Sequence, residues 1–293
     1  RRHGVQATFF VETVQRHYFK HDPMRPIARQ IVDAGHEVEL HTHPCWNVFR
    51  HEDWRERARS AKRLDDFRGR ALDDSVALIE QGIATFGDWG LDKPKAFRSG
   101  NLQHDATLYQ ALARVGIPYS SNIGTAIYDS GDPDYRLYSG HHARHGVIEC
   151  PVLSFSDWSL GGKKHMKSLT IAGTSFGETR TLLEKARAAG IATVVILTHP
   201  FEYIHWGDQG LTHTRAHHVT QQRLRRLCAF LQQNDDRFEG CGLVHALDAD
   251  ATVSDRNILL DVPLRQSVPR MAEQVIYDKY GRWALSRQPA RAS

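Results

Sequence analysis

Two histidines one residue apart, His41 and His43, follow a strand-like run in the stretch "GHEVELHTHPCW" at residues 35–46. Side chains two apart in an extended segment point to the same side, so both imidazoles can reach one ion. Neutral imidazole is a common zinc ligand, and a catalytic zinc site usually combines three protein ligands with one open position. A His-x-His pair alone is more often a surface accident, but here it indicates the rim of a metal site.

Reactive side chains also follow three other strand-like runs. Arg98 and Asn101 come at the end of "KAFRSG", Asp157 and Trp158 follow "IECPVL", and His199 lies near the end of "ATVVILTHP". Each alone has an ordinary structural interpretation, such as an ion-pair partner or a helix cap. Their joint placement at strand ends predicts that they converge on one site.

The elements that must position these residues alternate along the chain. Strands are predicted at 5–11, 36–41, 95–100, 118–123, 148–153, 192–200 and 242–248. Helices are predicted at 26–34, 54–86, 105–115, 176–189 and 217–234. This order predicts an α/β fold with a mainly parallel sheet, and so many units over ~250 residues favour a TIM-like barrel with its chemistry at the carboxyl ends of the strands.

The barrel is expected to occupy residues 1–253. Residues 254–293 change character: we expect a helix over "PLRQSVPRMAEQVIYDKYGRW" and then a polar, disordered tail.

Composition excludes some classes of protein. The 293 residues are 41% hydrophobic and 25% charged with a net charge of +4, which does not indicate a nucleic-acid partner. No stretch approaches the ~18 apolar residues of a membrane span, and no signal segment opens the chain. The four cysteines lack the density of a disulfide scaffold. We therefore expect a cytoplasmic protein, with a peripheral membrane location as an alternative.

The order of five motifs resembles the polysaccharide deacetylase (NodB-homology) family of carbohydrate esterases. They are "HGVQATFFV", "AGHEVELHTHP", "FRSGN", "SFSDW" and "VVILTHP", and the resemblance covers roughly residues 3–250. It is nearest to the branch that acts in lipopolysaccharide and other surface-polysaccharide biosynthesis. The resemblance implies a distorted (β/α)7 barrel that uses a divalent metal, most commonly zinc, to remove N-acetyl groups from sugars.

The resemblance also implies roles for residues. His41 and His43 match the metal ligands, although the family spacing is longer by two residues, and an alternative alignment puts Cys45 in the second position. Arg98 matches the arginine that orients the catalytic base, and the backbone N–H of Asn101 matches an oxyanion donor.

The remaining motifs imply an acid and its surroundings. His199 matches the general acid that protonates the departing amine, and Asp157 matches the carboxylate that holds this histidine. Substrate contacts are expected from Trp158, Leu197 and Trp46.

The sequence departs from the family at its start. The family carries an Asp-Asp motif on a first strand, which supplies a metal ligand and the base, and that strand is missing before "RRHGVQATFF". We expect both groups upstream of Arg1, and without that strand "ATFFV" becomes a sheet edge on which Phe9 and Phe10 face exposed positions. Asp22, Asp65 and Asp66 are interpreted as solvated charges.

A second group of histidines lies at His213, His217 and His218. Its spacing can bind a metal on a helix, but a polar helix start is the favoured interpretation. Tyr203 and Trp206 are further aromatic residues that could stack on a sugar.

The sequence thus predicts a metal-dependent N-deacetylase (acetyl or formyl) that acts on an amino sugar of a polysaccharide or glycolipid precursor. The rival hypothesis is a non-catalytic protein that binds metal or glycan on the same barrel. The amine-protonating acid favours the enzyme, and the absent aspartates favour the binding protein.

Overall fold

The computed structural model describes residues 3–60, 64–206, 214–254, 256–268 and 270. Its largest sheet has the order β1-β2-β3-β4-β6-β5 and consists of β1 (Thr8–Glu12), β2 (Glu37–Thr42), β3 (Ala96–Ser99), β4 (Tyr119–Ser120), β6 (Val147–Glu149) and β5 (His142–Arg144). All neighbours pair in parallel except β5, which is antiparallel to β6. The predicted mixed α/β fold with a mainly parallel sheet is therefore confirmed.

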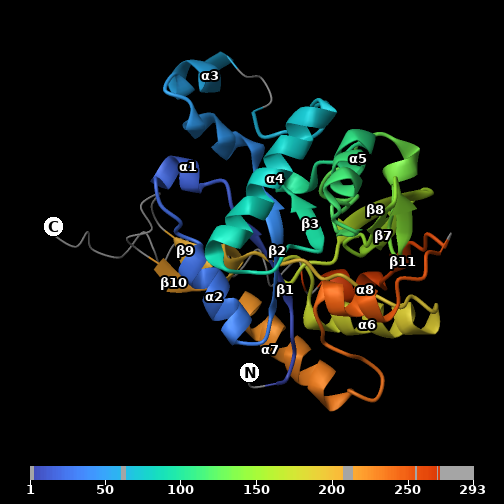
Figure 1. Ribbon diagram of the computed structural model, residues 1–293. Helices are drawn as coiled ribbons and strands as arrows, with labels where there is room; N and C mark the ends of the chain where they lie inside the picture. Colours follow the sequence, from blue (N-terminus) through green and yellow to red (C-terminus); the bar gives the residue numbers. More distant parts are fainter. Residues whose placement is uncertain (1–2, 61–63, 207–213, 255, 269, 271–293) are drawn as a thin grey trace.

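Helices cover one face of this sheet (Figure 1), as the alternation of side chains along a strand requires. Leu40 of β2 and Phe97 of β3 point to that face and pack with apolar residues of two helices, α4 (Leu72–Trp89) and α5 (Ala106–Val115). Helix α2 (Arg25–Asp33) covers β1 and β2 beside them. The predicted helices at 26–34 and 105–115 are thus present. Gly116, with φ 72°, ends α5 in the left-handed conformation that favours glycine.

The opposite face of the sheet is covered differently from the prediction. Residues 242–248 form helix α8 (Leu243–Ala249) and not a strand. Leu243 and Leu247, four apart on this helix, pack with Ala96 of β3 and with Cys150. Glu37 accepts hydrogen bonds from the backbone N–H groups at 244 and 245, so a carboxylate caps the positive end of the helix. A short apolar run suits a strand or a helix equally, and this cap decides for the helix.

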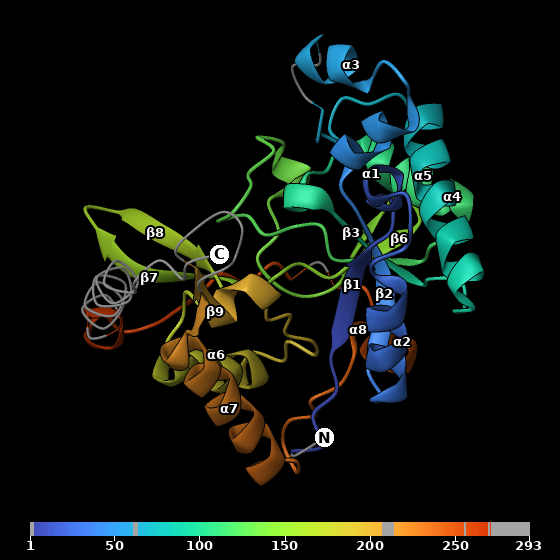
Figure 2. The ribbon, with the colours of Figure 1, turned by 90° about the vertical axis from the view of Figure 1, so that its left-hand side faces the viewer.

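The long helix predicted at 54–86 is also wrong in one respect. It is divided into α3 (Trp54–Ser60), which stands at the periphery in Figures 1 and 2, and α4. Residues 64–71 between them are not helical. Phe67 is fully buried in the core and Gly69 has φ 76°, a conformation that no helix contains. This non-helical segment brings Asp65 to the carboxyl end of β2.

A second layer lies on the other side of the main sheet (Figure 2). It contains the antiparallel hairpin β7 (Ser154–Leu160) and β8 (Lys163–Ser168), strand β11 (Leu260–Asp261), helix α6 (Phe176–Ala188) and helix α7 (His218–Gln233). The predicted helices at 176–189 and 217–234 are α6 and α7. The run at 192–200 pairs only at isolated bridges, Val195 with Val152 and Leu197 with Thr170.

The short elements connect these layers. They are helix α1 (Arg16–Phe19), the 3-10 helices η1 (Pro44–Arg50), η2 (Gly100–Leu102), η3 (Pro133–Tyr135) and η4 (Pro200–Tyr203), and the hairpin β9 (Ile204–Trp206) with β10 (Thr214–Ala216). Residues 264–268 are helical, at the start of the predicted C-terminal helix, and 271–293 lie outside the described residues. Within the described part of the chain, no helix is long and apolar enough to cross a membrane.

Strand β1 is the first in the order of its sheet. Phe9 is 38% exposed, as predicted for an edge. Phe10 is not exposed as predicted: it is half-buried, and the guanidinium of Arg98 lies 4.4 Å from the centre of its ring. The inward side of this strand therefore takes part in the interior of the molecule.

Candidate metal and active site

His41 lies on β2 beside Glu12 of β1 and Arg98 of β3. Its Nδ1 is 2.7 Å from the carbonyl oxygen of Arg98, so Nδ1 carries the proton and donates, and the lone pair is left on Nε2. Burial lowers the pKa of His41 to about 3, helped by the neighbouring His43 and by the charges of Arg98 and His199. The imidazole is therefore neutral near pH 7, the form that binds a metal ion.

His43 follows the end of β2, and its ring is held on several sides. Nδ1 is 2.7 Å from Oδ2 of Asp65, and the backbone N–H donates to Oε2 of Glu12 at 2.6 Å. The rings of His41 and His43 are 4.8 Å apart and perpendicular. A Cβ on Gly100 would lie 2.5 Å from Nδ1 of His43, so glycine is required where this ring lies against the β3 turn.

The two predicted metal ligands therefore share one arrangement. Each uses Nδ1 for a hydrogen bond to an oxygen, and no described residue hydrogen-bonds to Nε2 of either ring. Metal-binding histidines commonly donate their other N–H to a carbonyl or a carboxylate, which fixes the tautomer and the ring orientation. The residues present thus fit a divalent metal bound through the two Nε2 atoms.

Asp65 was interpreted from the sequence as a solvated charge, and this is wrong. Its side chain is 28% exposed and accepts hydrogen bonds from His43, from Nδ2 of Asn101 at 2.8 Å and from the backbone N–H of Cys45 at 3.2 Å. Burial raises the pKa of Asp65, but its hydrogen bonds with His43 and Cys45 lower it more, so the net shift is downward. The carboxylate is therefore ionised beside the histidines.

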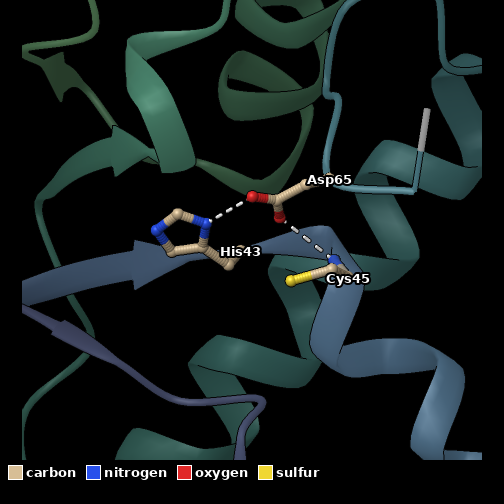
Figure 3. A group of neighbouring side chains, drawn as sticks. All are labelled: His43, Cys45 and Asp65. Atoms are coloured by element: carbon tan, nitrogen blue, oxygen red, sulfur yellow. Dashed lines mark hydrogen bonds and ion pairs between the residues drawn. The ribbon is translucent and has the colours of Figure 1, made fainter. Parts of the chain in front are cut away.

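Cys45 stands close to the same pair, as the alternative alignment allows. Ligand atoms of His43, Cys45 and Asp65 all lie within 4.8 Å of one another (Figure 3). The pKa of the Cys45 thiol is raised to about 12. Burial is the largest cause, and the hydrogen bond with Asp65 raises it further. Because a thiolate is the metal-binding form, the raised pKa of Cys45 favours the imidazoles over this sulfur as ligands.

Glu12 is a carboxylate that the sequence interpretation missed. It ends β1 directly beside His41 and accepts backbone hydrogen bonds from Val14 and His43. Burial raises its pKa to about 7 against those hydrogen bonds. Its position at the carboxyl end of a parallel strand was the signal that could have identified it.

The side chain of Arg98 contacts Ser121, and its role toward the catalytic base stays a prediction. Its guanidinium donates to the carbonyl of Ser121 at 2.9 Å and to the hydroxyl of Ser121 at 2.8 Å, and not to a carboxylate base among the described residues. Burial lowers the pKa of Arg98 to about 10. The group that reaches the site is its backbone carbonyl, which holds His41.

Asn101 adopts a left-handed backbone with φ 54°, and so does Leu102 with φ 55°. Two such residues in succession are strained, and the hydrogen bond from the Asn101 side chain to Asp65 helps to hold the turn. This turn carries the backbone N–H that was predicted as an oxyanion donor.

The predicted pair of Asp157 and His199 does not form. Nδ1 of His199 is 3.0 Å from Oε1 of Glu202, three residues later in η4, and its side chain is 47% exposed. Asp157 is fully buried, 2.5 Å from Nδ1 of His165 and 2.8 Å from Nη2 of Arg270.

The physical reason for this is a β-bulge. The register of β7 shifts between Ser156 and Trp158, and a bulge re-aims the side chain at its centre. Asp157 lies at this bulge and contacts the segment after β11 instead of the strand end near 199.

The predicted substrate contacts have mixed surroundings. Trp46 lies in η1 among the rings of Tyr18, Phe19 and Phe49. Trp158 is 36% exposed and stacks on His165 at 5.2 Å.

Leu197 is buried against Leu102 of the Asn101 turn. The hydroxyl groups of Tyr203 and Thr198 share a hydrogen bond, and Trp206 is 46% exposed.

In the second histidine group, His217 is the N-cap of α7 and accepts from the backbone N–H of Thr220. This confirms the polar helix start, and His213 lies outside the described residues.

The geometry defines a class first: an α/β protein with two oriented imidazoles and nearby carboxylates at the carboxyl ends of parallel strands. Residues 1–120 match the sequence model of the family described as polysaccharide deacetylase. The match bears out the predicted resemblance to polysaccharide deacetylases for residues 1–120 of the 293-residue chain. The match does not distinguish the lipopolysaccharide branch.

One solved structure is similar at the level of the fold. A polysaccharide deacetylase crystal structure from Mycobacterium smegmatis is similar with a TM-score of 0.53 and 17% identity, over 88% of this chain and 76% of the other.

Two further structures are a family 4 carbohydrate esterase from Streptomyces lividans in complex with acetate (TM-score 0.40, 14% identity, 80% and 77% covered) and a family 4 acetyl xylan esterase from Clostridium thermocellum in complex with a cobalt ion (0.41, 18%, 86% and 82%). No curated protein sequence matches the chain.

Proposed function

We propose that this protein is a metal-dependent hydrolase that removes an N-acetyl or N-formyl group from an amino sugar of a polysaccharide or glycolipid precursor. The observation that carries the proposal is the pair His41 and His43, whose Nδ1 atoms are both committed to oxygens so that both Nε2 atoms can bind one ion. A divalent ion bound there, most commonly zinc, would polarise the amide carbonyl and acidify a water molecule.

The acid step is assigned to His199. An amine is a poor leaving group unless it is protonated, so the reaction requires a proton donor on the sugar side. His199 is close enough to His41 for its charge to contribute to the lowered pKa of that residue, after the larger effects of burial and of His43. Glu202, and not Asp157, is bonded to its Nδ1, which leaves Nε2 to carry the proton to the amine.

The surrounding groups have supporting roles in this proposal. The backbone N–H of Asn101 would stabilise the oxyanion, on a turn held by Asp65. Trp46 and Trp158 offer aromatic faces to a sugar, and Leu197 supports the Asn101 turn from below. Arg98 holds His41 through its carbonyl.

Finer assignments belong to the same proposal. We place the chain in the surface-polysaccharide branch, with a distorted (β/α)7 barrel over residues 1–253 and a C-terminal extension from 254. The described parallel strands and the bridges at Val195 and Leu197 support the barrel. The four cysteines are free, which supports a reducing cytoplasm.

One experiment separates this function from a binding-only protein. The wild type and a His41→Ala, His43→Ala double variant are compared for metal content and for acetate release from an N-acetylated chito-oligosaccharide. The control is His245→Ala, because His245 is exposed and pairs with Glu239. We expect one metal ion and turnover for the wild type and the control, and loss of both for the double variant.

Unchanged metal content in the double variant would overturn the site. Metal binding without acetate release by the wild type would favour the binding protein. His199→Ala should reduce the rate at least ~10²-fold, the usual scale for loss of a general acid, and leave metal content unchanged.

A further inference from the structure

Asp65 lies in neither a helix nor a strand, yet its segment is fixed. Phe67, two residues later, is fully buried in the main core. The side chain of Arg70 donates to the backbone carbonyls of Leu64 and Asp66, and Oδ1 of Asp66 accepts from Gln103 at 2.8 Å. These contacts attach the segment to the core and to the turn after β3, so Asp65 is presented at a defined place.

The carboxylate of Asp65 joins three parts of the site. Oδ2 accepts from Nδ1 of His43 at 2.7 Å and from Nδ2 of Asn101 at 2.8 Å. Oδ1 accepts from the backbone N–H of Cys45 at 3.2 Å. The bond to His43 requires the proton on Nδ1, and in the neutral ring this leaves the lone pair on Nε2. The bond to Asn101 holds a turn with left-handed backbone angles.

A direct bond from Asp65 to the metal is the alternative, since Asp65, His43 and Cys45 have ligand atoms near one another. If His43 bound the ion through Nδ1 in that arrangement, it would lose its hydrogen bond to Asp65, and His41 is not one of the three residues. In Figure 3 the second ring nitrogen of His43 points away from both Asp65 and Cys45. The orientation of the ring favours Asp65 as a support and not as a ligand.

We propose that Asp65 is a positioning residue of the metal site, which aims Nε2 of His43 at the ion and fixes the Asn101 turn through the same oxygen. This role rests on the proposed metal site. The inference goes beyond the proposed metal site because one carboxylate, from the segment between α3 and α4, supports both the metal ligand His43 and the turn that carries the oxyanion donor Asn101. Loss of such an outer partner typically weakens metal binding ~10–100-fold.

The test is titration of the metal-free full chain with Co²⁺, followed by the visible absorption of the bound ion. The variant is Asp65→Asn, and the matched control is Asp53→Asn, which changes an exposed carboxylate that pairs with Arg57. For a positioning residue we expect ~10–100-fold weaker Co²⁺ binding by Asp65→Asn with unchanged band positions, because the ligands stay the same. The control should bind as the wild type does.

Two results would overturn the role of Asp65: unchanged Co²⁺ affinity, or altered bands that mark Asp65 as a ligand. If the wild type bound no Co²⁺, the proposed function would fail and this role with it.

If Asp65→Asn does not fold, a measurement on the wild-type protein still tests the proposal. Nitrogen-15 NMR of the metal-free wild type should show His43 protonated at Nδ1, and a neutral ring protonated only at Nε2 would overturn the proposal.

Discussion

Among the clusters of carboxylates with histidine or arginine in the described part of the chain, the one around Asp65 and the one around Asp157 differ in how far they are exposed to solvent. In the first, Asp65 and His43 are 28% and 27% exposed in their side chains, and a ring nitrogen is left for a ligand. In the second, Asp157 and Glu178 are fully buried, and Arg270 pairs with both at 2.8 and 3.1 Å. The hydroxyl of Ser267 also donates to Glu178 at 3.0 Å.

The difference distinguishes a binding site from an ion-pair network that stabilises the fold. The buried cluster joins β7 and α6 to Ser267 and Arg270, and each carboxylate oxygen of Asp157 and Glu178 has a partner within the protein. In the half-exposed cluster, Nε2 of His43 has no hydrogen-bond partner among the described residues, so a ligand can bind to it. Both contain residues from motifs that the family resemblance marked as catalytic, so the motif alone does not tell which role a residue has here.

The largest effect is expected from a substitution that breaks the buried cluster. Arg270→Met leaves two buried carboxylates without their cation, and removal of one partner from a buried pair costs about 3–5 kcal/mol. Urea unfolding should show this loss, with Co²⁺ affinity of the folded protein unchanged. The control is Arg114→Met, whose partner Asp73 is 86% exposed and whose loss should cost less than about 1 kcal/mol. Equal losses for the two variants would remove the distinction between the clusters.

An intermediate effect is expected at the first cluster. In Gly100→Ala the new Cβ would meet Nδ1 of His43 at 2.5 Å, so the ring or the turn must shift. We expect Co²⁺ affinity to fall about 10-fold, at the low end of the effect of disturbing a ligand's support. The control is Gly87→Ala in α4, where a Cβ meets nothing within 4 Å. Wild-type affinity in Gly100→Ala would show that this ring position is not needed.

The smallest effect is expected in the pH dependence of the free energy of unfolding, at a histidine outside the metal site. His141 is buried and the carbonyl of its backbone accepts from Ser254, so it belongs to the contact of the C-terminal segment and not to the metal site. Burial lowers the pKa of His141 below 6.5, against a hydrogen bond with Thr252 that raises it. The unfolded chain therefore binds this proton first, and the free energy of unfolding falls as the pH drops below 6.5 toward the folded pKa.

His141→Gln should reduce this acid slope in unfolding experiments between pH 7.5 and pH 5, and the part that comes from His41 should remain. His245→Gln, at an exposed histidine, should keep it. The same slope in wild type and His141→Gln would contradict the assignment.

Much of the fold followed from local patterns. Alternation of strand-like and helical runs predicted β1 to β4, β6 and five helical regions, because side-chain period and glycine at helix ends are properties of short segments. The pattern failed where a short apolar run had two solutions. At 243–249 the cap from Glu37, more than two hundred residues away in the chain, decided for a helix.

The sequence by itself determined that His41 and His43 lie at the end of a parallel strand, and that residues 1–120 resemble polysaccharide deacetylases. Only the tertiary structure decided which carboxylate serves which histidine. Asp65 reaches His43 because the chain turns between α3 and α4 and buries Phe67, and Asp157 is taken by Arg270, 113 residues later. Ion pairs depend on distances of about 3 Å between atoms that the folded backbone brings together, and no local spacing encodes such a meeting.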